Sequence, residues 1–364
     1  MSFLRCNPMV SVIGDEYEIL ITANDNGISK AIVGDQVYYE ENSGVLSSEK
    51  AFSKIRVPQT ALNEARKYTV VYKKTIERKG YFSEFGQEQT ADFEFKPLDK
   101  TDNINIYHVA DVHYNFDVAL KTTAWFGDDL DVLIVNGDIG EVESEQNYFE
   151  VCKFVGDVTG GKIPVIFVRG NHDTRGHLAE RFTDYFPCDG KNTYFTFNLG
   201  CLCGVALDCG EDKWDNHPEY GGANAFEAFR RRETEFLRKM ELPKDKICFA
   251  ISHVCPAQTA QEKDSIFNID KELYEEWNAL LAQKGIRFMI CGHMHRAYVL
   301  KKNDQRSIRP HDFPVVTGSA VYGDGELWGC AMTIKGGKLD VLFTDNFGKE
   351  RERHQIDIAT GNVD

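Results

Sequence analysis

The sequence predicts an α/β protein preceded by a smaller, all-β segment. Up to about residue 97, short stretches rich in β-branched and aromatic residues are separated by turn residues, and no helical pattern is convincing. From Asn103 onward, apolar runs of strand length alternate with segments of helical periodicity. With 364 residues, the chain is also longer than a single hydrophobic core usually requires. We therefore expect one domain over residues 1–100 and a larger domain over residues 101–364.

The first segment has the pattern of a small antiparallel sandwich. Turn sequences such as Asn26-Gly27 separate short candidate strands, which is the spacing expected of such a fold. The stretch around Tyr68 and Tyr72 resembles the corner of an immunoglobulin-like or fibronectin type III domain, in which a tyrosine anchors a loop. An amphipathic strand would give a similar pattern. Strands are expected at residues 17–22, 30–33, 36–40, 67–72 and 91–95.

The second segment contains strands and helices in alternation, followed by hairpins. Strands are expected at residues 104–110, 132–136, 164–169, 194–198, 203–207, 247–252 and 287–291. Helices are expected at residues 118–126, 145–155, 176–186, 224–240 and 271–284. From residue 314 to about 357 the pattern is that of hairpins, with a clear turn at residues 335–338.

Composition and charge narrow the class of protein. The N-terminus lacks the pattern of a signal peptide, and no apolar run approaches the roughly 18 residues needed to span a bilayer. The ten cysteines show no framework spacing, so we expect reduced, buried thiols in a cytoplasmic protein without a membrane association. The net charge is −15 for the chain, and −13 of it belongs to residues 101–364. A surface this acidic disfavours nucleic-acid binding.

Five short clusters of metal-ligand residue types follow or close the predicted strands of the second segment. Asp, Asn and His are ligands that hard or borderline divalent metals prefer, and a neighbouring glycine allows a sharp turn at the strand end. Because strand ends converge at one edge of an open sheet, clusters far apart in the chain can share one site. The pattern predicts a binuclear metal site. The clusters are Asp111-Val-His113, Gly137-Asp138, Gly170-Asn171-His172-Asp173, Ser252-His253 and Gly292-His293-Met294-His295.

In order and position, these motifs resemble those of the calcineurin-like metallophosphoesterases, and the resemblance covers about residues 103–300. It implies a sandwich of two mixed β-sheets flanked by helices. It also implies two divalent metal ions that share Asp138, since two close dications require negative charge between them. By motif, the ligands of the first ion are Asp111, His113, Asp138 and His295, and those of the second are Asp138, Asn171, His253 and His293.

The resemblance also implies a mechanism. A hydroxide that bridges the two ions is the expected nucleophile, because metal coordination lowers the pKa of water from 15.7 to about 7. His172 matches the family histidine that protonates the leaving oxygen or stabilises its charge, and Asp173 is expected to orient His172. Arg175 is a candidate phosphate clamp, although an arginine at a helix start is about as often a surface residue. His217 lies in a long polar loop that could border the substrate.

One departure concerns the metal. A sandwich ahead of the catalytic domain resembles the layout of purple acid phosphatases, whose second motif carries an iron-ligating tyrosine three residues beyond the shared Asp. Here that position is Glu141. Without the phenolate, Mn, Fe(II) or Zn is favoured over ferric iron, and no purple colour is expected.

The expected activity is hydrolysis of small phosphoesters, either monoesters or diesters, by an enzyme that binds no nucleic acid. Two alternatives are a nuclease of the DNA-repair type and a non-catalytic scaffold that retains the fold. A nuclease would require a basic groove, which the acidic second segment does not favour. A scaffold generally loses ligands or the catalytic histidine, whereas all of them are present here.

Overall fold

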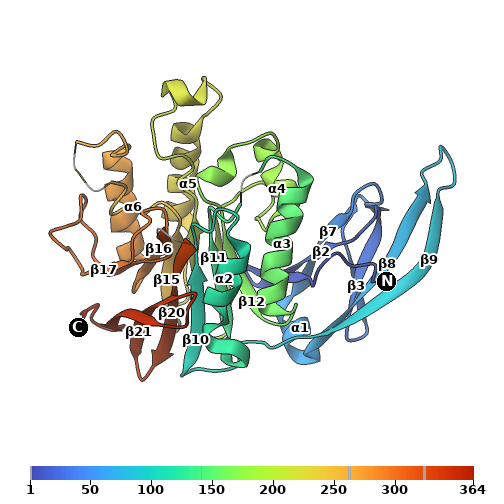
Figure 1. Cartoon of the computed structure of the whole chain (residues 1–364), viewed down its shortest axis with the longest axis horizontal. Coiled ribbons are helices and arrows are strands. Elements are labelled where there is room, and N and C mark those ends of the chain that lie inside the picture. The colour runs from blue at the N-terminus through green and yellow to red at the C-terminus, as the bar shows by residue number, and fades with distance from the viewer. Residues whose placement is uncertain (1, 141, 261, 263, 323–324) are drawn as a thin grey trace.

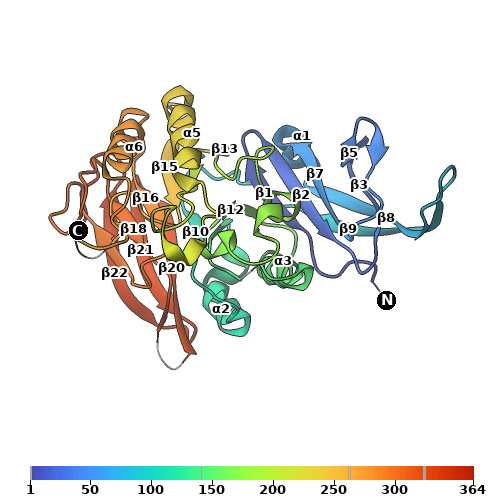
Figure 2. The same cartoon turned by 90° about the horizontal axis from the view of Figure 1, so that it is seen from above.

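The computed structural model describes residues 2–140, 142–260, 262, 264–322 and 325–364. Two large mixed sheets pack against each other, and helices cover both outer faces (Figures 1 and 2). Between the sheets, Ile134 and Ile166 of the first sheet belong to the same buried cluster as Phe249 and Ile290 of the second. The structure confirms the predicted α/β fold with mixed sheets.

The first sheet has the order β22-β21-β20-β10-β11-β12-β1-β2-β7, and β19 pairs with β20. Its central strands β10, β11 and β12 are parallel, so their carboxyl ends lie at one edge. The strands are β1 (Met9–Ile13), β2 (Glu16–Thr22), β7 (Phe52–Pro58), β10 (Ile104–Val109), β11 (Val132–Asn136), β12 (Pro164–Val168), β19 (Ala320–Tyr322), β20 (Glu326–Lys335), β21 (Lys338–Asp345) and β22 (Glu350–Asp357).

The second sheet has the order β13-β14-β15-β16-β18-β17. Its strands β14, β15, β16 and β18 are parallel. The six strands are β13 (Phe195–Leu199), β14 (Leu202–Leu207), β15 (Ile247–Ser252), β16 (Met289–Cys291), β17 (Tyr298–Leu300) and β18 (Val315–Thr317). The strands predicted between residues 104 and 291 are therefore confirmed, with ends that differ by one or two residues.

Each sheet is covered by its own helices. Tyr148 and Val151 of α3 pack on the first sheet, while Leu237 of α5 and Trp277 of α6 pack on the second.

The helix predicted at residues 176–186 is wrong over its first part, where Gly176 has a φ of +91° and only short helical turns follow. No helix in the described ranges is long and apolar enough to cross a membrane. The helices and 3-10 turns are α2 (Phe116–Thr123), η1 (Ala124–Asp129), α3 (Glu145–Thr159), η2 (His172–Thr174), η3 (Ala179–Arg181), α4 (Phe182–Tyr185), η4 (Pro218–Tyr220), α5 (Phe226–Lys239) and α6 (Lys271–Gln283).

The N-terminal segment contributes strands to three sheets, one of which is the short pair β5-β6. A four-stranded sheet has the order β4-β3-β8-β9, and its long β8–β9 hairpin projects from the body (Figure 1). By contrast, β1 pairs in parallel with β12, so β1, β2 and β7 extend the first large sheet. Sequence patterns missed β1, β7 and the helix α1. A separate sandwich domain over residues 1–100 stays a prediction. The remaining elements are β3 (Gly27–Val33), β4 (Gln36–Tyr39), β5 (Glu41–Asn42), β6 (Val45–Leu46), α1 (Gln59–Ala65), β8 (Lys67–Glu77) and β9 (Glu84–Glu94).

Tyr68 connects the N-terminal segment to the loop between α3 and β12. Its buried hydroxyl donates a hydrogen bond of 2.8 Å to the carbonyl oxygen of Gly161. Tyr68→Phe leaves that carbonyl buried without this donor, so we expect the free energy of unfolding to fall by about 1–3 kcal/mol. Urea denaturation measures the change. Tyr81→Phe is the control, because Tyr81 is 88% exposed. Equal stability of both variants would show that the Tyr68 bond contributes nothing.

One pair of cysteines is not in the reduced state that the sequence predicted. Cys203 and Cys248 lie directly opposite each other on β14 and β15, and the structure joins them as a disulfide. The expectation that all ten cysteines are reduced thiols is therefore wrong for this pair. Pairing of neighbouring strands, which no spacing rule anticipates, brings the two sulfurs together. The other eight cysteines are free, and six of them are buried.

Candidate metal centre

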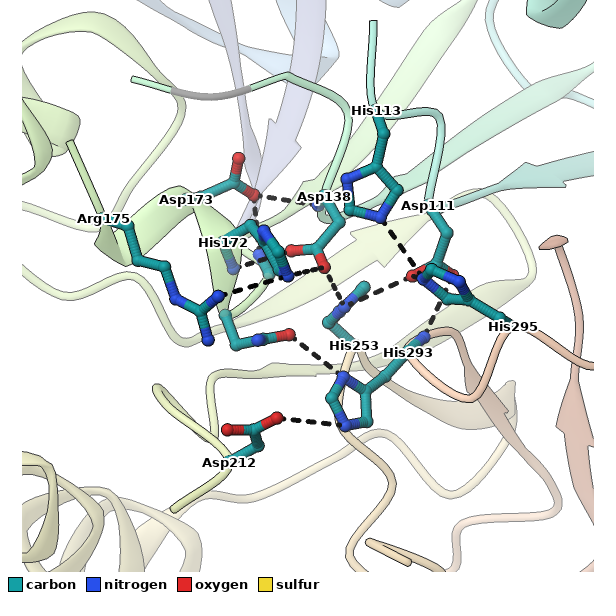
Figure 3. Close-up of polar contacts among 12 residues, drawn as sticks. Asp111, His113, Asp138, His172, Asp173, Arg175, Asp212, His253, His293 and His295 are labelled. Carbon is teal, nitrogen blue, oxygen red and sulfur yellow. Dashed lines mark hydrogen bonds and ion pairs between the residues drawn. The ribbon is translucent and has the colours of Figure 1, made fainter. Parts of the chain in front are cut away.

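The loops after five strands bring the predicted ligands together (Figure 3). Asp111 and His113 follow β10, Asp138 follows β11, and Asn171 follows β12. His253 follows β15, and the two histidines of the last motif follow β16. We expected the ligands at the edge of one sheet. The structure corrects this, because three of the strands belong to the first sheet and two to the second.

Most of the predicted ligands have an unusual backbone conformation. Five of the seven have positive φ angles, between +43° and +66°. Non-glycine residues rarely adopt this conformation, which costs on the order of 1–3 kcal/mol each and persists only where the surroundings enforce it. Such concentrated strain is typical of a functional site. The five residues are Asp111, His113, Asp138, His293 and His295.

Two glycines of the motifs allow these loops to approach closely. A Cβ atom on Gly170 would collide with the side chain and backbone nitrogen of Asp138. A Cβ atom on Gly137 would collide with the backbone of Gly170 and with the ring of His253. Packing around Asp138 therefore requires glycine at both positions, and at Gly137 a φ of +76° favours glycine as well.

Asp111, His113 and His295 form one group of side chains. The Nε2 atoms of His113 and His295 are 3.3 Å apart. Nε2 of His295 is also 3.3 Å from Oδ1 of Asp111. One candidate ligand atom from each of these residues lies within 4.8 Å of the others, a spacing that can hold a metal ion.

A second group adjoins the first through carboxylates. Nε2 of His253 lies 3.1 Å from Oδ2 of Asp138 and 3.7 Å from Oδ1 of Asp111. Nδ1 of His293 lies 3.0 Å from Oδ1 of Asn171. Asp138 belongs to two of the candidate metal-holding groups, one with His113 and one with His253. Its carboxylate therefore lies between the two halves of the site.

The buried donor atoms fit a metal ion. Oδ1 of Asp111 and Nε2 of His253 are buried and form no well-aligned hydrogen bond, although each lies close to an oppositely charged group of the site. On the other side of the ring, Nδ1 of His253 contacts the carbonyl oxygen of Asn136 at 2.6 Å. When Nδ1 carries the proton for that bond, Nε2 presents a lone pair to the site, as in many metal-binding histidines. Buried polar atoms without a well-aligned hydrogen bond are costly, and a bound ligand would reduce that cost.

The charges at the site favour the ionised form of the central carboxylate. Burial alone raises the pKa of Asp138, but the charge of His253 and a hydrogen bond with it bring that pKa well below the usual range. Burial lowers the pKa of His253, but the carboxylates of Asp138 and Asp111 outweigh burial and raise it to about 10. Burial lowers the pKa values of His113 and His293, which keeps both rings neutral.

Asp173 does not make the contact expected of it. Its Oδ2 atom accepts hydrogen bonds from the backbone nitrogens of Gly170 at 2.8 Å and Asp138 at 3.1 Å. Its carboxylate therefore holds the two ligand loops together. The expectation that Asp173 orients the ring of His172 is not met, because its hydrogen bonds go to these backbone nitrogens. Burial and the charge of Asp138 raise the pKa of Asp173 to about 7.

His172 lies outside the predicted ligand sets, although its ring forms one of the candidate metal-holding groups together with His113 and Asp138. Its side chain is 34% exposed, and its Nε2 atom lies 3.9 Å from Oδ2 of Asp138 and 3.4 Å from Nη1 of Arg175. The Arg175 guanidinium forms two bonds to Glu211, of 2.6 and 2.7 Å. Arg175 therefore points toward the site, as Figure 3 shows, while Glu211 fixes its position.

The loop after β14 places a further carboxylate beside the centre. Oδ2 of Asp212 lies 3.8 Å from Nε2 of His293, and Asp212 is buried. Sequence reasoning noted this loop but missed Glu211 and Asp212 as neighbours of the site. The sequence does contain a signal for them: both carboxylates come shortly after a strand and a glycine, which is also the position of the predicted metal ligands. His217, in the same loop, contacts Glu219 and the Tyr220 ring and is in none of the metal-holding groups found among the described residues.

Comparisons with known proteins agree with this geometry. A family model described as calcineurin-like phosphoesterase matches residues 104–297. The serine/threonine-protein phosphatase CPPED1 of Mus musculus is 25% identical over 139 residues, which are 37% of this chain and 42% of the mouse protein. The chain thus matches less than half the length of that relative.

Two solved structures resemble the whole chain. Purple acid phosphatase PPD1 from yellow lupin (Lupinus luteus) has a TM-score of 0.60 at 11% identity, and the match covers 97% of this chain and 75% of the lupin chain. PhoD has a TM-score of 0.58 at 9% identity, with 100% of this chain and 92% of that chain covered. At such low identity, these matches establish the fold alone. Glu141, which replaces the iron-ligating tyrosine of the purple enzymes, lies outside the described residues.

Proposed function

Because this chain belongs to the calcineurin-like phosphoesterase family, we propose that it hydrolyses phosphoesters with the help of two divalent metal ions. The observation that carries the proposal is the position of Asp138, whose carboxylate joins two groups of candidate ligands. The buried atoms of Asp111 and His253 that form no well-aligned hydrogen bond support it. Similarity to a phosphatase is consistent with the same reaction. We further propose a small phosphoester as the substrate and the cytoplasm as the location.

The two sets of ligands follow from the contacts. Asp111, His113 and His295 would hold the first ion together with Asp138. Asn171, His253 and His293 would hold the second ion, again with Asp138. A mixture of imidazole and oxygen ligands suits Mn, Fe(II) or Zn. When bound, the ions would activate water for attack on phosphorus and neutralise charge on the phosphoryl oxygens.

The remaining polar residues have roles that their positions suggest. His172 is close enough to Asp138 to reach a phosphoester bound there, and its exposed ring can donate a proton to the leaving oxygen. Arg175, held by Glu211, presents Nη1 on the same side and would bind a phosphoryl oxygen. Asp173 holds the loops of Asp138 and Gly170, so it acts through the ligands and not on the substrate.

The test is reconstitution of the metal-free protein. With Mn, Fe(II) or Zn added, the protein is expected to hydrolyse p-nitrophenyl phosphate or bis-p-nitrophenyl phosphate, and metal analysis is expected to give two ions per chain. Absence of cleavage with every metal, together with absence of bound metal, would contradict the proposal and favour a scaffold. Cleavage of DNA in preference to both small esters would favour a nuclease. A visible charge-transfer band would contradict the predicted absence of ferric iron.

The affinity for metal is expected to increase with pH. In the metal-free protein, the raised pKa of about 10 keeps His253 protonated at neutral pH, and that proton must leave before Nε2 can bind an ion. For each proton that the metal displaces, the apparent affinity rises about tenfold per unit increase in pH. The displacement of one proton therefore raises the affinity roughly 100-fold between pH 6 and pH 8. Calorimetric titration with Mn²⁺ in buffers of different ionisation enthalpy measures both affinity and proton release. Affinity that is constant over this range would contradict the assignment of His253.

Asp212 is expected to support the second ion indirectly. His293 faces Asn171 through Nδ1 and Asp212 through Nε2, so the carboxylate can hold the ring in the tautomer that binds metal through Nδ1. We expect Asp212→Ala to lower the affinity for the second ion about 10- to 100-fold and to leave the first ion in place. Asp212→Asn, which retains an acceptor, should lose less.

Manganese titration followed by EPR distinguishes protein with one ion from protein with a coupled pair. Glu219→Gln is the control, since Glu219 shares the partner Lys213 with Asp212 but is exposed. If Asp212→Ala bound both ions as the wild-type protein does, the proposed support of His293 would be wrong.

A further inference from the structure

Two cavities border Met294, the residue between two of the predicted ligands. The smaller has a volume of about 450 Å³, and His293, Asp212 and Glu262 are among the residues that line it. The larger, here named the Arg296 cavity, has a volume of about 720 Å³ and lies among the residues of β17, β19 and β20. Met294 lines both cavities. Because Met294 lies between His293 and His295 in the chain, both cavities border the last ligand motif.

The two cavities differ in charge. Asp212 and Glu262 line the smaller one, and its described lining includes no basic side chain. Arg296 and Arg306 line the larger one together with a single carboxylate, Glu352, which contacts His354. A second negative charge on the substrate would be repelled by the carboxylates of the smaller cavity and attracted into the larger one.

Of the two arginines that line this cavity, Arg296 is the one that remains available to bind an anion. The guanidinium of Arg306 donates to Asp304 at 3.0 and 2.8 Å and to the carbonyl oxygen of Val299 at 2.8 Å. Arg296 is exposed, and no carboxylate in the part of the chain that the structure describes forms an ion pair with it. An unpaired arginine next to a metal ligand, in a chain with a net charge of −15, is suited to bind an anion.

The wall of the Arg296 cavity is aromatic and apolar. The ring centroids of Tyr322 and Trp328 are 4.6 Å apart. Their polar atoms are already engaged: the Tyr322 hydroxyl accepts from the backbone nitrogen of Ala297 at 3.3 Å, and the Trp328 indole donates to Glu326 at 2.6 Å. The rings are thus held in place and offer carbon surface, to which Leu300 adds an aliphatic side chain. Such a wall suits a planar, apolar group.

We propose that the Arg296 cavity binds the part of the substrate that is not released as phosphate, and that this part joins a planar ring to a second negative charge, as in a nucleoside diphosphate. The inference rests on the proposed function. The terminal phosphate would lie at the metal centre and the inner phosphate at Arg296, whose Cα is about 3.8 Å from that of His295. The base would lie against Tyr322 and Trp328. The oxygen of a water molecule adds to the terminal phosphorus, and the bond between that phosphorus and the bridging oxygen breaks. The nucleoside monophosphate then leaves with a proton on the bridging oxygen.

The test compares two substrates on one pair of variants. For adenosine 5′-diphosphate, we expect Arg296→Ala to lower kcat/KM about 10- to 100-fold, mainly through KM, because a charge-assisted hydrogen bond is lost. For p-nitrophenyl phosphate, which lacks the second charge, the change should stay within about twofold. Arg296→Lys should recover part of the loss. Arg287→Ala is the matched control, because Arg287 is exposed and lies before the opposite end of β16.

A second measurement reports binding without turnover. Adenosine 5′-monophosphate should inhibit hydrolysis of p-nitrophenyl phosphate, with an inhibition constant that Arg296→Ala raises about tenfold. Equal effects of Arg296→Ala on both substrates, or no effect on either, would overturn the inference while leaving the proposed function intact. If the metal-loaded wild-type protein hydrolysed neither substrate, the proposed function itself would fail.

Discussion

Asp138→Asn is expected to lower kcat/KM for phosphoester hydrolysis by at least about 10³-fold. Asp138 belongs to two of the groups of candidate ligands, one with His113 and one with His253, and its low pKa keeps it ionised at neutral pH. The amide is neutral, so two dications would no longer have this negative charge between them. A loss of about 4 kcal/mol of transition-state stabilisation corresponds to roughly a thousandfold in rate. Metal content should fall from two ions per chain to one or none.

Asp131→Asn is the matched control for this experiment. Asp131 lies immediately before β11, whereas Asp138 follows the other end of the same strand, and both carboxylates are buried. Asp131 pairs with Lys96 and Lys100, so its replacement should lower stability and leave metal content unchanged. Retention of both ions and of full activity in Asp138→Asn would contradict the proposed binuclear site.

His172→Gln is expected to act selectively on substrates with poor leaving groups. A general acid contributes about 10²- to 10⁴-fold when the leaving oxygen needs a proton. An alkoxide needs that proton, whereas p-nitrophenolate leaves readily without it. We therefore expect kcat for an alkyl phosphate to fall about 10²- to 10⁴-fold, and kcat for p-nitrophenyl phosphate to fall much less. A series of esters with graded leaving-group pKa measures this dependence as a slope.

The variant should also retain both metal ions, since His172 stands outside the two proposed sets of ligands. His177→Gln is the control, because His177 lies five positions further along and its side chain is 84% exposed. Equal losses for all leaving groups, accompanied by loss of metal, would instead make His172 a ligand. The proposed proton donor would then be wrong.

The strands that carry the site were predictable because their signal is local. β10, β11 and β12 are largely buried and apolar, and each ends one or two positions before a motif residue. Strands β1 and β7 were missed although both are largely buried. β1 is short and lies between Pro8 and Gly14, so its length and composition alone did not distinguish it from a loop. Its pairing with β12, more than 150 positions away, is what makes it part of the sheet.

The neighbours of the site were less predictable than the ligands. Arg175 was a candidate phosphate clamp, but its partner Glu211, which holds the guanidinium from a loop 36 positions away, was not predicted. Asp173 was expected to orient His172, but it accepts hydrogen bonds from backbone nitrogens. Both contacts depend on how loops pack at the ends of strands, and no sequence period encodes that packing.

The sequence by itself determined the kinds of donor atoms, their order and their places at strand ends, because ligand chemistry and strand patterns are properties of short segments. Only the tertiary structure decided that two sheets supply the ligands, that β1, β2 and β7 extend the first sheet, and that Cys203 lies against Cys248. It also placed Arg296 beside an aromatic cavity. These features arise from contacts between segments distant in the chain, and their geometry exists only once the sheets have packed.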